Sequence, residues 1–133
     1  MVTWGDSSYG GDSSAVAAAF NGTIDVTQVF STEYAFAALR ADGSVVTWGN
    51  SSDGGDSSAV AAALNGTIDV TQVFSTGSAF AALRADGSVV TWGDSLSGGN
   101  SSAVAAQLDG TIDVTQVFAT AGPLPRCAPM ARW

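Results

Sequence analysis

The stretch VTQVFSTGSAFAALRADGSVVTWG (70–93) decides the fold of this chain. Its first strand lies within TIDVTQVFST (67–76), where β-branched residues are dense and predict extended structure. The remainder, SAFAALRADGSVVTWG (78–93), predicts two strands joined around Asp86-Gly87, because Asp-Gly is a strong hairpin signal. The stretch therefore predicts three consecutive antiparallel strands.

The same pattern recurs with a period of 44 residues, at which Trp4, Trp48 and Trp92 are spaced. The copies span residues 2–45, 46–89 and, incompletely, 90–120. The first two copies differ at only five positions, and the third follows the second with seven differences. Because a fixed period of this length indicates tandem structural units, we predict a mainly β array of about three antiparallel β-meanders.

The rest of each unit has weaker local signals. The serine- and glycine-rich DSSYGGDSS (6–14) predicts a loop, and Asn65-Gly66 predicts a closing turn. Between such segments, SSAVAAA (57–63) fits either a short helix capped by Ser57 or Ser58, or a fourth, outer strand. The pattern leaves this fourth element open.

At these motifs the stretch 70–93 resembles the repeats of the regulator of chromosome condensation family and, more closely, bacterial repeats of the β-lactamase inhibitory protein type. The matches are Ala81–Leu83, Asp86-Gly87 and Trp92-Gly93. The resemblance implies an open or partial β-propeller with one blade per unit; a β-solenoid-like stack with a short helix per repeat is the alternative. Ser78-Ala79 stands where the family has Gly-His, and no loop matches the family's nucleotide-exchange wedge. That activity is therefore not implied.

Residues 1–120 form the array, whereas 121–133 (AGPLPRCAPMARW) depart from it. Back-translated with permitted codons and read from the third base, Pro123–Trp133 encodes FAALRADGSV, the hairpin missing from the third copy. We therefore interpret the tail as the product of a single-base deletion near codon 121. We also expect the chain to be a fragment of a longer repeat protein. Proline lacks the amide donor that a strand ladder needs, so we expect no ordered pairing in the tail.

Charge and composition exclude several classes of function. Twelve acidic residues against four arginines give a net charge of −8, which repels phosphate backbones and anionic lipids. We therefore expect neither nucleic acid nor membrane as a partner. The sequence has no apolar run long enough to span a bilayer and no leader at Met1. We expect a soluble chain whose location is unspecified; an extracellular parent protein is compatible with it.

The chain has few of the side chains that catalysis and metal binding use most often. The chain has no histidine and a single cysteine, Cys127, so Ser-His and Cys-His pairs and the usual transition-metal clusters are not available. The loops GGDSS (10–14 and 54–58) and GGNSS (98–102) invite a calcium interpretation, but we favour capping, because calcium takes six or more oxygen ligands. We expect no cofactor, no metal and no enzyme activity. The repeated Trp-Gly tryptophans are predicted to be core anchors between units.

The most suggestive positions are those in the connecting loops at which the copies differ. They are Asp6, Asn50 and Asp94; Tyr9, Asp53 and Ser97; and Glu33 with Tyr34 against Gly77 with Ser78. Repeat proteins often keep the frame and vary the contact face, although neutral drift predicts the same pattern. We expect a non-catalytic scaffold for protein–protein interaction. A truncated, frameshifted reading frame without independent function is the alternative, and an enzyme is a distant third.

The ends of the array carry a further expectation. Residues 1–4 correspond to the third strand of a unit, and the third copy has lost its hairpin. Both ends should therefore expose unpaired strand edges, which are templates for pairing with another chain. We expect self-association through these open blade edges.

Overall fold

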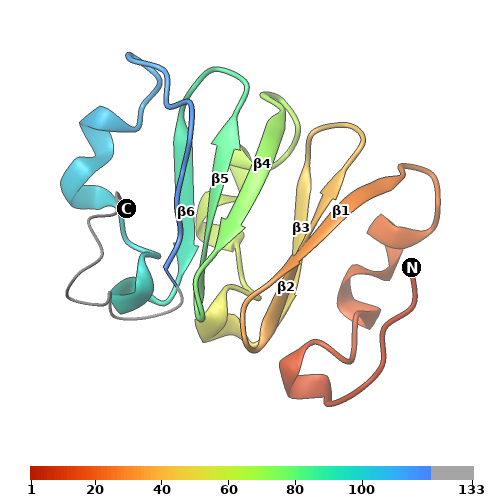
Figure 1. Ribbon diagram of the computed structural model, residues 1–133. Helices are drawn as coiled ribbons and strands as arrows, with labels where there is room; N and C mark the ends of the chain where they lie inside the picture. The colour runs from red at the N-terminus through yellow and green to blue at the C-terminus, as the bar shows by residue number, and fades with distance from the viewer. Residues whose placement is uncertain (121–133) are drawn as a thin grey trace.

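The computed structural model describes residues 1–120, which form two three-stranded antiparallel sheets in tandem (Figure 1). The strands are β1 (Val26–Ser31), β2 (Ala35–Arg40) and β3 (Val45–Gly49), then β4 (Val70–Ser75), β5 (Ala79–Arg84) and β6 (Val89–Gly93). In each sheet the spatial order is the sequence order, so each sheet is a β-meander. The predicted fold, mainly β with tandem antiparallel meanders, is confirmed. The tail 121–133, with the predictions made for it, lies outside the described residues.

The hairpin turn of the first sheet lies at Asp42-Gly43, one period before the predicted turn at Asp86-Gly87, and it is not the two-residue turn that Asp-Gly usually signals. The amide of Gly43 donates to the carbonyl of Arg40 at 3.0 Å, and the amide of Arg40 donates to the carbonyl of Ser44 at 2.9 Å. Gly43 has φ +78, whereas no non-glycine residue of the described chain has a positive φ. A two-residue mirror-image turn requires positive φ at the aspartate as well. The loop is therefore the longer type that ends in a glycine bulge.

Both sheets carry the same irregularity in their first strand. Val26 pairs with Arg40 and Gln28 with Leu39, so that Thr27 is an extra residue in the ladder. The hydroxyl of Thr27 donates to the carbonyl of Leu39 at 3.1 Å. The second sheet repeats this β-bulge one period later. Such bulges increase the local twist of the strand.

The fourth element of each unit is a short 3-10 helix, so the outer-strand alternative is wrong. These helices are η2 (Ser14–Phe20), η4 (Ser58–Ala63) and η6 (Ser102–Gln107), each preceded by a shorter one: η1 (Ser7–Tyr9), η3 (Ser51–Asp53) and η5 (Ser95–Ser97). The predicted serine cap is also wrong, because Ser57 makes no side-chain capping bond. Instead, Asp56 Oδ1 accepts a bond from the amide of Ser58 at 2.9 Å. An aspartate reaches the helix amides that the serine hydroxyl does not.

The two sheets pack face to face. The face of the first sheet that carries Ala37 and Leu39 lies against the face of the second that carries Val73 and Phe80. Small alanines on the facing strands let the sheets approach closely. Leu64, at the end of η4, is buried between them, and its carbonyl accepts a bond from the amide of Val45 at 2.9 Å. The 3-10 helix thus ties each unit to the next.

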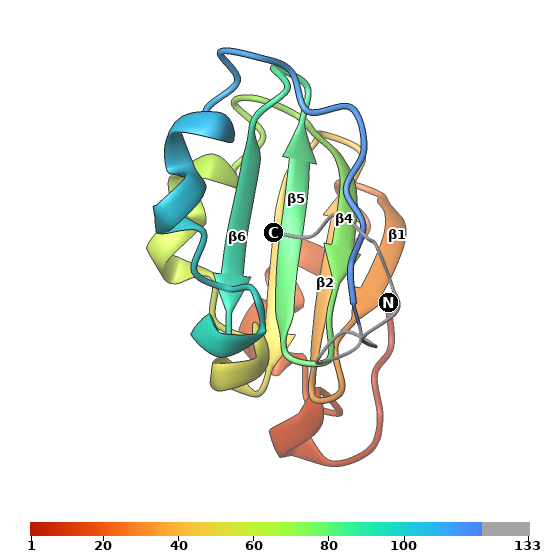
Figure 2. The ribbon, with the colours of Figure 1, turned by 60° about the vertical axis from the view of Figure 1, so that its left-hand side comes forward.

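The third unit adds η6 and the extended segment 111–120, which runs beside the second sheet (Figure 2). The amide of Val114 donates to the carbonyl of Gly87 at 2.9 Å, as the amide of Val70 donates to Gly43. The segment therefore has the position of a first strand, but it pairs with no other strand among residues 1–120. Two complete sheets, not three, make up the described chain. No helix within this range is long and apolar enough to cross a bilayer.

Candidate functional site

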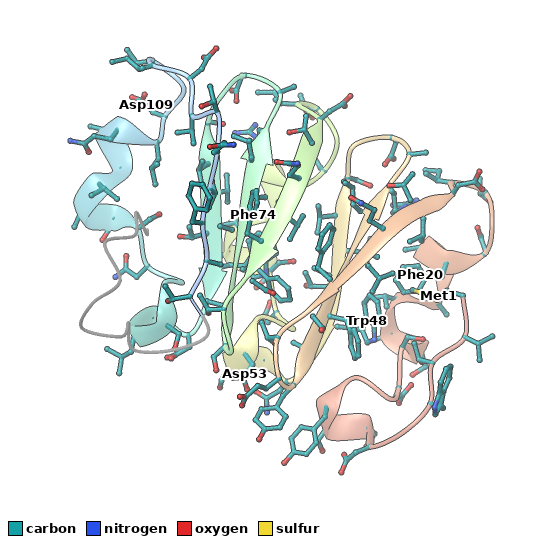
Figure 3. All side chains as sticks on the ribbon, viewed as in Figure 1. Met1, Phe20, Trp48, Asp53, Phe74 and Asp109 are labelled. Carbon is teal, nitrogen blue, oxygen red and sulfur yellow. The ribbon has the colours of Figure 1, made fainter. Side chains whose placement is uncertain are left out.

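The varied loop positions gather at one end of the stack, which we call the variable end. It consists of the turns between the first and second strand of each sheet, together with the loops that contain η1, η3 and η5. The amide of Asn50 donates to the carbonyl of Tyr34 at 2.8 Å, which joins the turn of one unit to the first loop of the next. The same bond joins Asp94 to Ser78 at 2.9 Å. In Figure 3, Asp53 lies at this end and Asp109 at the opposite end.

The loops of the variable end are anchored through main-chain atoms. Thr32 Oγ1 donates to the carbonyl of Asp53 at 2.9 Å, and Thr76 Oγ1 donates to the carbonyl of Ser97 at the same distance. A carbonyl is available whatever side chain the residue carries. The side chains at these positions can therefore differ between units without loss of the anchor.

One set of varied positions has a structural role instead. Asp6, Asn50 and Asp94 each accept a bond at Oδ1 from the amide two residues later. The donors are Ser8, Ser52 and Leu96, at 2.8, 2.9 and 3.4 Å. Asn and Asp both make this local bond, so the difference preserves the turn. These positions remain candidates, but their conserved bond explains them as caps.

The two tyrosines of the variable end lie against each other. Tyr9 comes from η1 and Tyr34 from the turn after β1, and their ring centroids are 4.4 Å apart with an interplanar angle of 35°. Both remain exposed, by 47% and 40% respectively. In the next unit the equivalent positions hold Asp53 and Ser78. One unit therefore presents an aromatic pair where the next presents small polar groups.

Sequence comparison missed one residue of this end. Leu96 in η5 is almost fully exposed, at 95%, although it is a large apolar side chain. The other copies have Ser8 and Ser52 at this position. An apolar residue within a Ser- and Gly-rich loop was a signal that could have identified it.

The GGDSS loops have the capping geometry expected of them. The Oδ1 atoms of Asp12 and Asn100 accept bonds from the amides of Ser14 and Ser102 at 2.8 and 3.0 Å. Hydrogen bonding by Ser14, from its side chain and its amide, lowers the pKa of Asp12. Within the described range, no group of three or more acidic or cysteine side chains is placed to hold a metal ion.

The tryptophans behave differently in different units. Trp48 and Trp92 are buried core anchors, as predicted, and their indole Nε1 atoms donate to the carbonyls of Gly10 and Gly54 at 3.0 and 3.1 Å. For Trp4 the prediction is wrong, because its side chain is 84% exposed. No strand among residues 1–120 pairs with the segment that carries Trp4.

Comparison with known proteins identifies no relative of the chain. No protein-family model matches the chain, and no match is found among curated proteins. The relationship expected from the motifs accordingly stays a prediction.

Proposed function

We propose that this chain is a non-catalytic repeat scaffold that binds another protein through its variable end. The observation that carries the proposal is that the variable end combines constant anchoring bonds with varied exposed side chains. Bonds from a threonine hydroxyl to a main-chain carbonyl, Thr32 to Asp53 and Thr76 to Ser97, recur unchanged. The side chains displayed above them differ between units, most clearly Tyr9 against Asp53. A constant frame with a varied face is the arrangement by which repeat proteins make binding surfaces.

The side chains of the variable end suit a protein partner. Tyrosine supplies a flat apolar ring with a polar tip and is enriched in protein interfaces. The Tyr9–Tyr34 pair is such a feature, and the exposed Leu96 adds apolar area. The two arginines of the described chain, Arg40 and Arg84, close the hairpins at the other end of the sheets. The acidic character of the chain, with its net charge of −8, disfavours nucleic acid as the partner.

We also propose that the units are propeller-type blades related to the regulator of chromosome condensation repeats. Support comes from the three-stranded meander, from the Asp-Gly hairpin and from the third strand that ends in Trp-Gly, all of which occur in both sheets. An array extended by further 44-residue copies tests this proposal. A crystal structure with a closed ring would support it, and a straight stack would favour a solenoid.

The binding proposal is tested by exchanging the face of one unit for that of the next. In the triple variant Tyr9→Asp, Glu33→Gly and Tyr34→Ser, the first unit receives the residues found one period later. Gly77, which stands at the position of Glu33, does not have a positive φ, so the exchange is compatible with the backbone. The variant should melt within a few degrees of the original chain, because the changes lie on the surface.

The probe is a displayed library of random peptides, selected on the original chain. We expect enriched peptides to lose at least about tenfold in affinity for the triple variant, since interface tyrosines are frequent hot spots. A matched control, Val104→Ala in η6, removes an exposed apolar side chain away from the variable end and should leave affinity unchanged. Selection that yields no peptide dependent on the exchanged residues would contradict the proposal. The reading frame without independent function would then be the better account.

A further inference from the structure

The segment 2–5 at the N-terminal end of the stack has the sequence and position of a third strand. Its sequence, VTWG, recurs at 46–49 and 90–93. Thr3 Oγ1 lies 2.9 Å from Ser13 Oγ beside η2. The equivalent atoms of Thr47 and Ser57, beside η4, are also 2.9 Å apart. Residues 2–5 are therefore held in the place of a third strand.

The segment nevertheless lacks the pairing that its copies have. Trp48 is 5% exposed and Trp92 4%, whereas Trp4 is 84% exposed. The two buried tryptophans lie in strands that pair with β2 and β5. Within residues 1–120 no strand pairs with 2–5. A second strand is therefore one component that the segment lacks, besides the counterparts of Phe20 and Gly10 that also cover Trp48.

The neighbouring face of the first sheet is open in the same way. Val29 is 47% exposed, while the equivalent Val73 is 4% exposed because the first sheet covers it. Phe36 is half-buried, and its equivalent Phe80 is fully buried. Exposed apolar surface of this kind marks an interaction site. Thr3 contacts Ser13 at the start of η2, and Phe20 at the end of η2 packs on Trp48 in this face, so the open segment borders it.

The register of the existing sheets specifies what would fit. In the first sheet Ala35 pairs with Gly49, Phe36 with Trp48, Ala37 with Thr47, Ala38 with Val46 and Leu39 with Val45. One period earlier the third-strand positions are Gly5, Trp4, Thr3, Val2 and Met1. A strand of the Ala-Phe-Ala-Ala-Leu type would therefore pair with them, antiparallel. The first strand of the same hairpin would cover Val29, as β1 and β2 cover Val73.

We propose that the N-terminal end of the stack is a docking site for a β-hairpin of the repeat's own type, supplied from outside residues 1–133. This docking hairpin consists of the first and second strands of a unit. The hairpin would bind by strand addition, with main-chain bonds to residues 2–5 and alternate side chains packed on the first sheet. A second copy of the chain is a poor donor. Within residues 1–120, both pairs of first and second strands already pair with their own third strands, and donation would break a sheet. This site is separate from the variable end.

The test uses the full chain and a synthetic peptide of residues 67–84, TIDVTQVFSTGSAFAALR. Binding should bury Trp4, shift its emission to the blue and protect it from acrylamide. The variant Trp4→Phe should lose that signal, which assigns the change to this side chain. Trp4→Ala should bind at least about tenfold more weakly. Val104→Ala, which shortens an exposed apolar side chain of η6 in the third unit, should bind as the original does.

The peptide has its own matched pair of controls. Ala81→Lys places a charge at the position where Ala37 packs on the next sheet, and should abolish binding. Gln72→Lys, at a position exposed in both sheets, should bind normally. Equal binding of the two variant peptides would overturn the proposal. So would self-association of the unmixed chain that buries Trp4, because it would make a second copy the occupant.

A fused form excludes failure of the free peptide to fold. Residues 67–88 placed directly before Met1 restore the native spacing, because residue 89 is the counterpart of Met1. Trp4 should then be clearly better protected from acrylamide than in the original chain, because it stacks on the phenylalanine of the added strand as Trp48 stacks on Phe36. If Trp4 stays accessible in this fusion, the proposal is wrong.

Discussion

The first and second sheets have the same sequence in all three strands, yet they differ in how one face is covered. The face that carries Val29 is open in the first sheet, whereas the equivalent face of the second sheet, which carries Val73, is covered. Val29 is half-exposed and Val73 is buried. The difference arises because the first sheet covers the second, while within residues 1–120 the corresponding face of the first sheet is packed by side chains of η2 and by no sheet.

What stays equal between the sheets shows what each unit determines by itself. Register, bulge and hairpin turn repeat with the same partners one period apart. Local sequence therefore sets the strands, and the neighbouring unit sets the burial. In such an array stability is a sum of unit terms and nearest-neighbour interface terms. Matched substitutions in the two sheets separate these terms.

The largest expected difference concerns the phenylalanines that stack on the core tryptophans. Phe80 and Phe36 lie 5.3 Å, centroid to centroid, from Trp92 and Trp48 respectively. Phe80→Ala should lower the free energy of unfolding by about 3–5 kcal/mol, because it empties a fully buried site. Phe36→Ala should lower it by at most about 2 kcal/mol, since part of that ring already contacts water.

Denaturant unfolding of the two variants measures both values. Equal losses would mean that the open face of the first sheet is covered in solution, which would contradict the comparison. The occupant would then be sought by sedimentation at several protein concentrations.

The tryptophans give the next largest effect, and here the two sheets should agree. Trp48→Phe and Trp92→Phe each remove an indole donor and leave the carbonyl of Gly10 or Gly54 without its partner. Loss of one partner of a buried bond costs about 1–3 kcal/mol. Trp4→Phe should change the free energy of unfolding by less than about 0.5 kcal/mol, because the side chain is exposed. Thermal or denaturant unfolding of all three variants tests this order, and a loss for Trp4→Phe equal to the others would contradict it.

Much of the fold could be predicted from the sequence, because the signals are local and repeated. β-Branched runs and Asp-Gly dipeptides predicted the strands and hairpins of both complete units. The exposure of Trp4 could not be predicted from its motif, because burial depends on a partner strand that the motif does not contain. The form of the turn at Asp42-Gly43 and the bulge at Thr27 depend on backbone geometry, which residue types specify only loosely.

The candidate site was predictable as a set of positions but not as a surface. Comparison of the copies found Tyr9 and Tyr34 as separate loop differences, and only the fold brings their rings together. Comparison of the copies also could not distinguish positions whose side chains are exposed for binding from positions whose side chains hold a turn. Asn50 differs from its counterparts yet makes the same capping bond. Leu96 was missed because the first two copies agree at its position, where Ser8 and Ser52 stand, and only the third copy differs.

A third prediction concerns the threonines of the turns, where the substitution in the first sheet should cost more stability than the one in the second. Thr32 is buried, whereas Thr76 is only half-buried, because the turn of the first sheet is covered by the second unit. The amide of Glu33 donates to the carbonyl of Gly77 across this boundary at 2.9 Å. Thr→Val removes the hydroxyl and keeps the shape, so Thr32→Val should cost about 1–2 kcal/mol and Thr76→Val about 1 kcal/mol or less. Chemical unfolding gives both numbers, and a larger loss at Thr76 would refute the assigned direction of covering.

The smallest effect concerns pH and should be the same in both sheets. Bonds from the side chain and amide of Ser44 lower the pKa of Asp42, and Arg40 acts in the same direction. Ser88 and Arg84 lower the pKa of Asp86 in the same way. A folded-state pKa below the unfolded value means that the stabilisation is fully present above the unfolded pKa, about 3.9. It is lost as the pH falls below that value, through the folded pKa.

Both hairpins should therefore contribute a small loss of Tm as the pH falls below about 4. Asp42→Asn and Asp86→Asn retain an oxygen that accepts from the serine amide but remove the titration, so each should flatten the acid limb of the Tm profile by a similar amount. The effect is small because both carboxylates are solvent-exposed. Since each turn makes the same contact with the following unit, Gly43 with Val70 and Gly87 with Val114, equality is the expected result. A clearly larger change at Asp86 would show that the neighbouring unit acts on the hairpin chemistry as well as on burial, and the separation of unit and interface terms would fail.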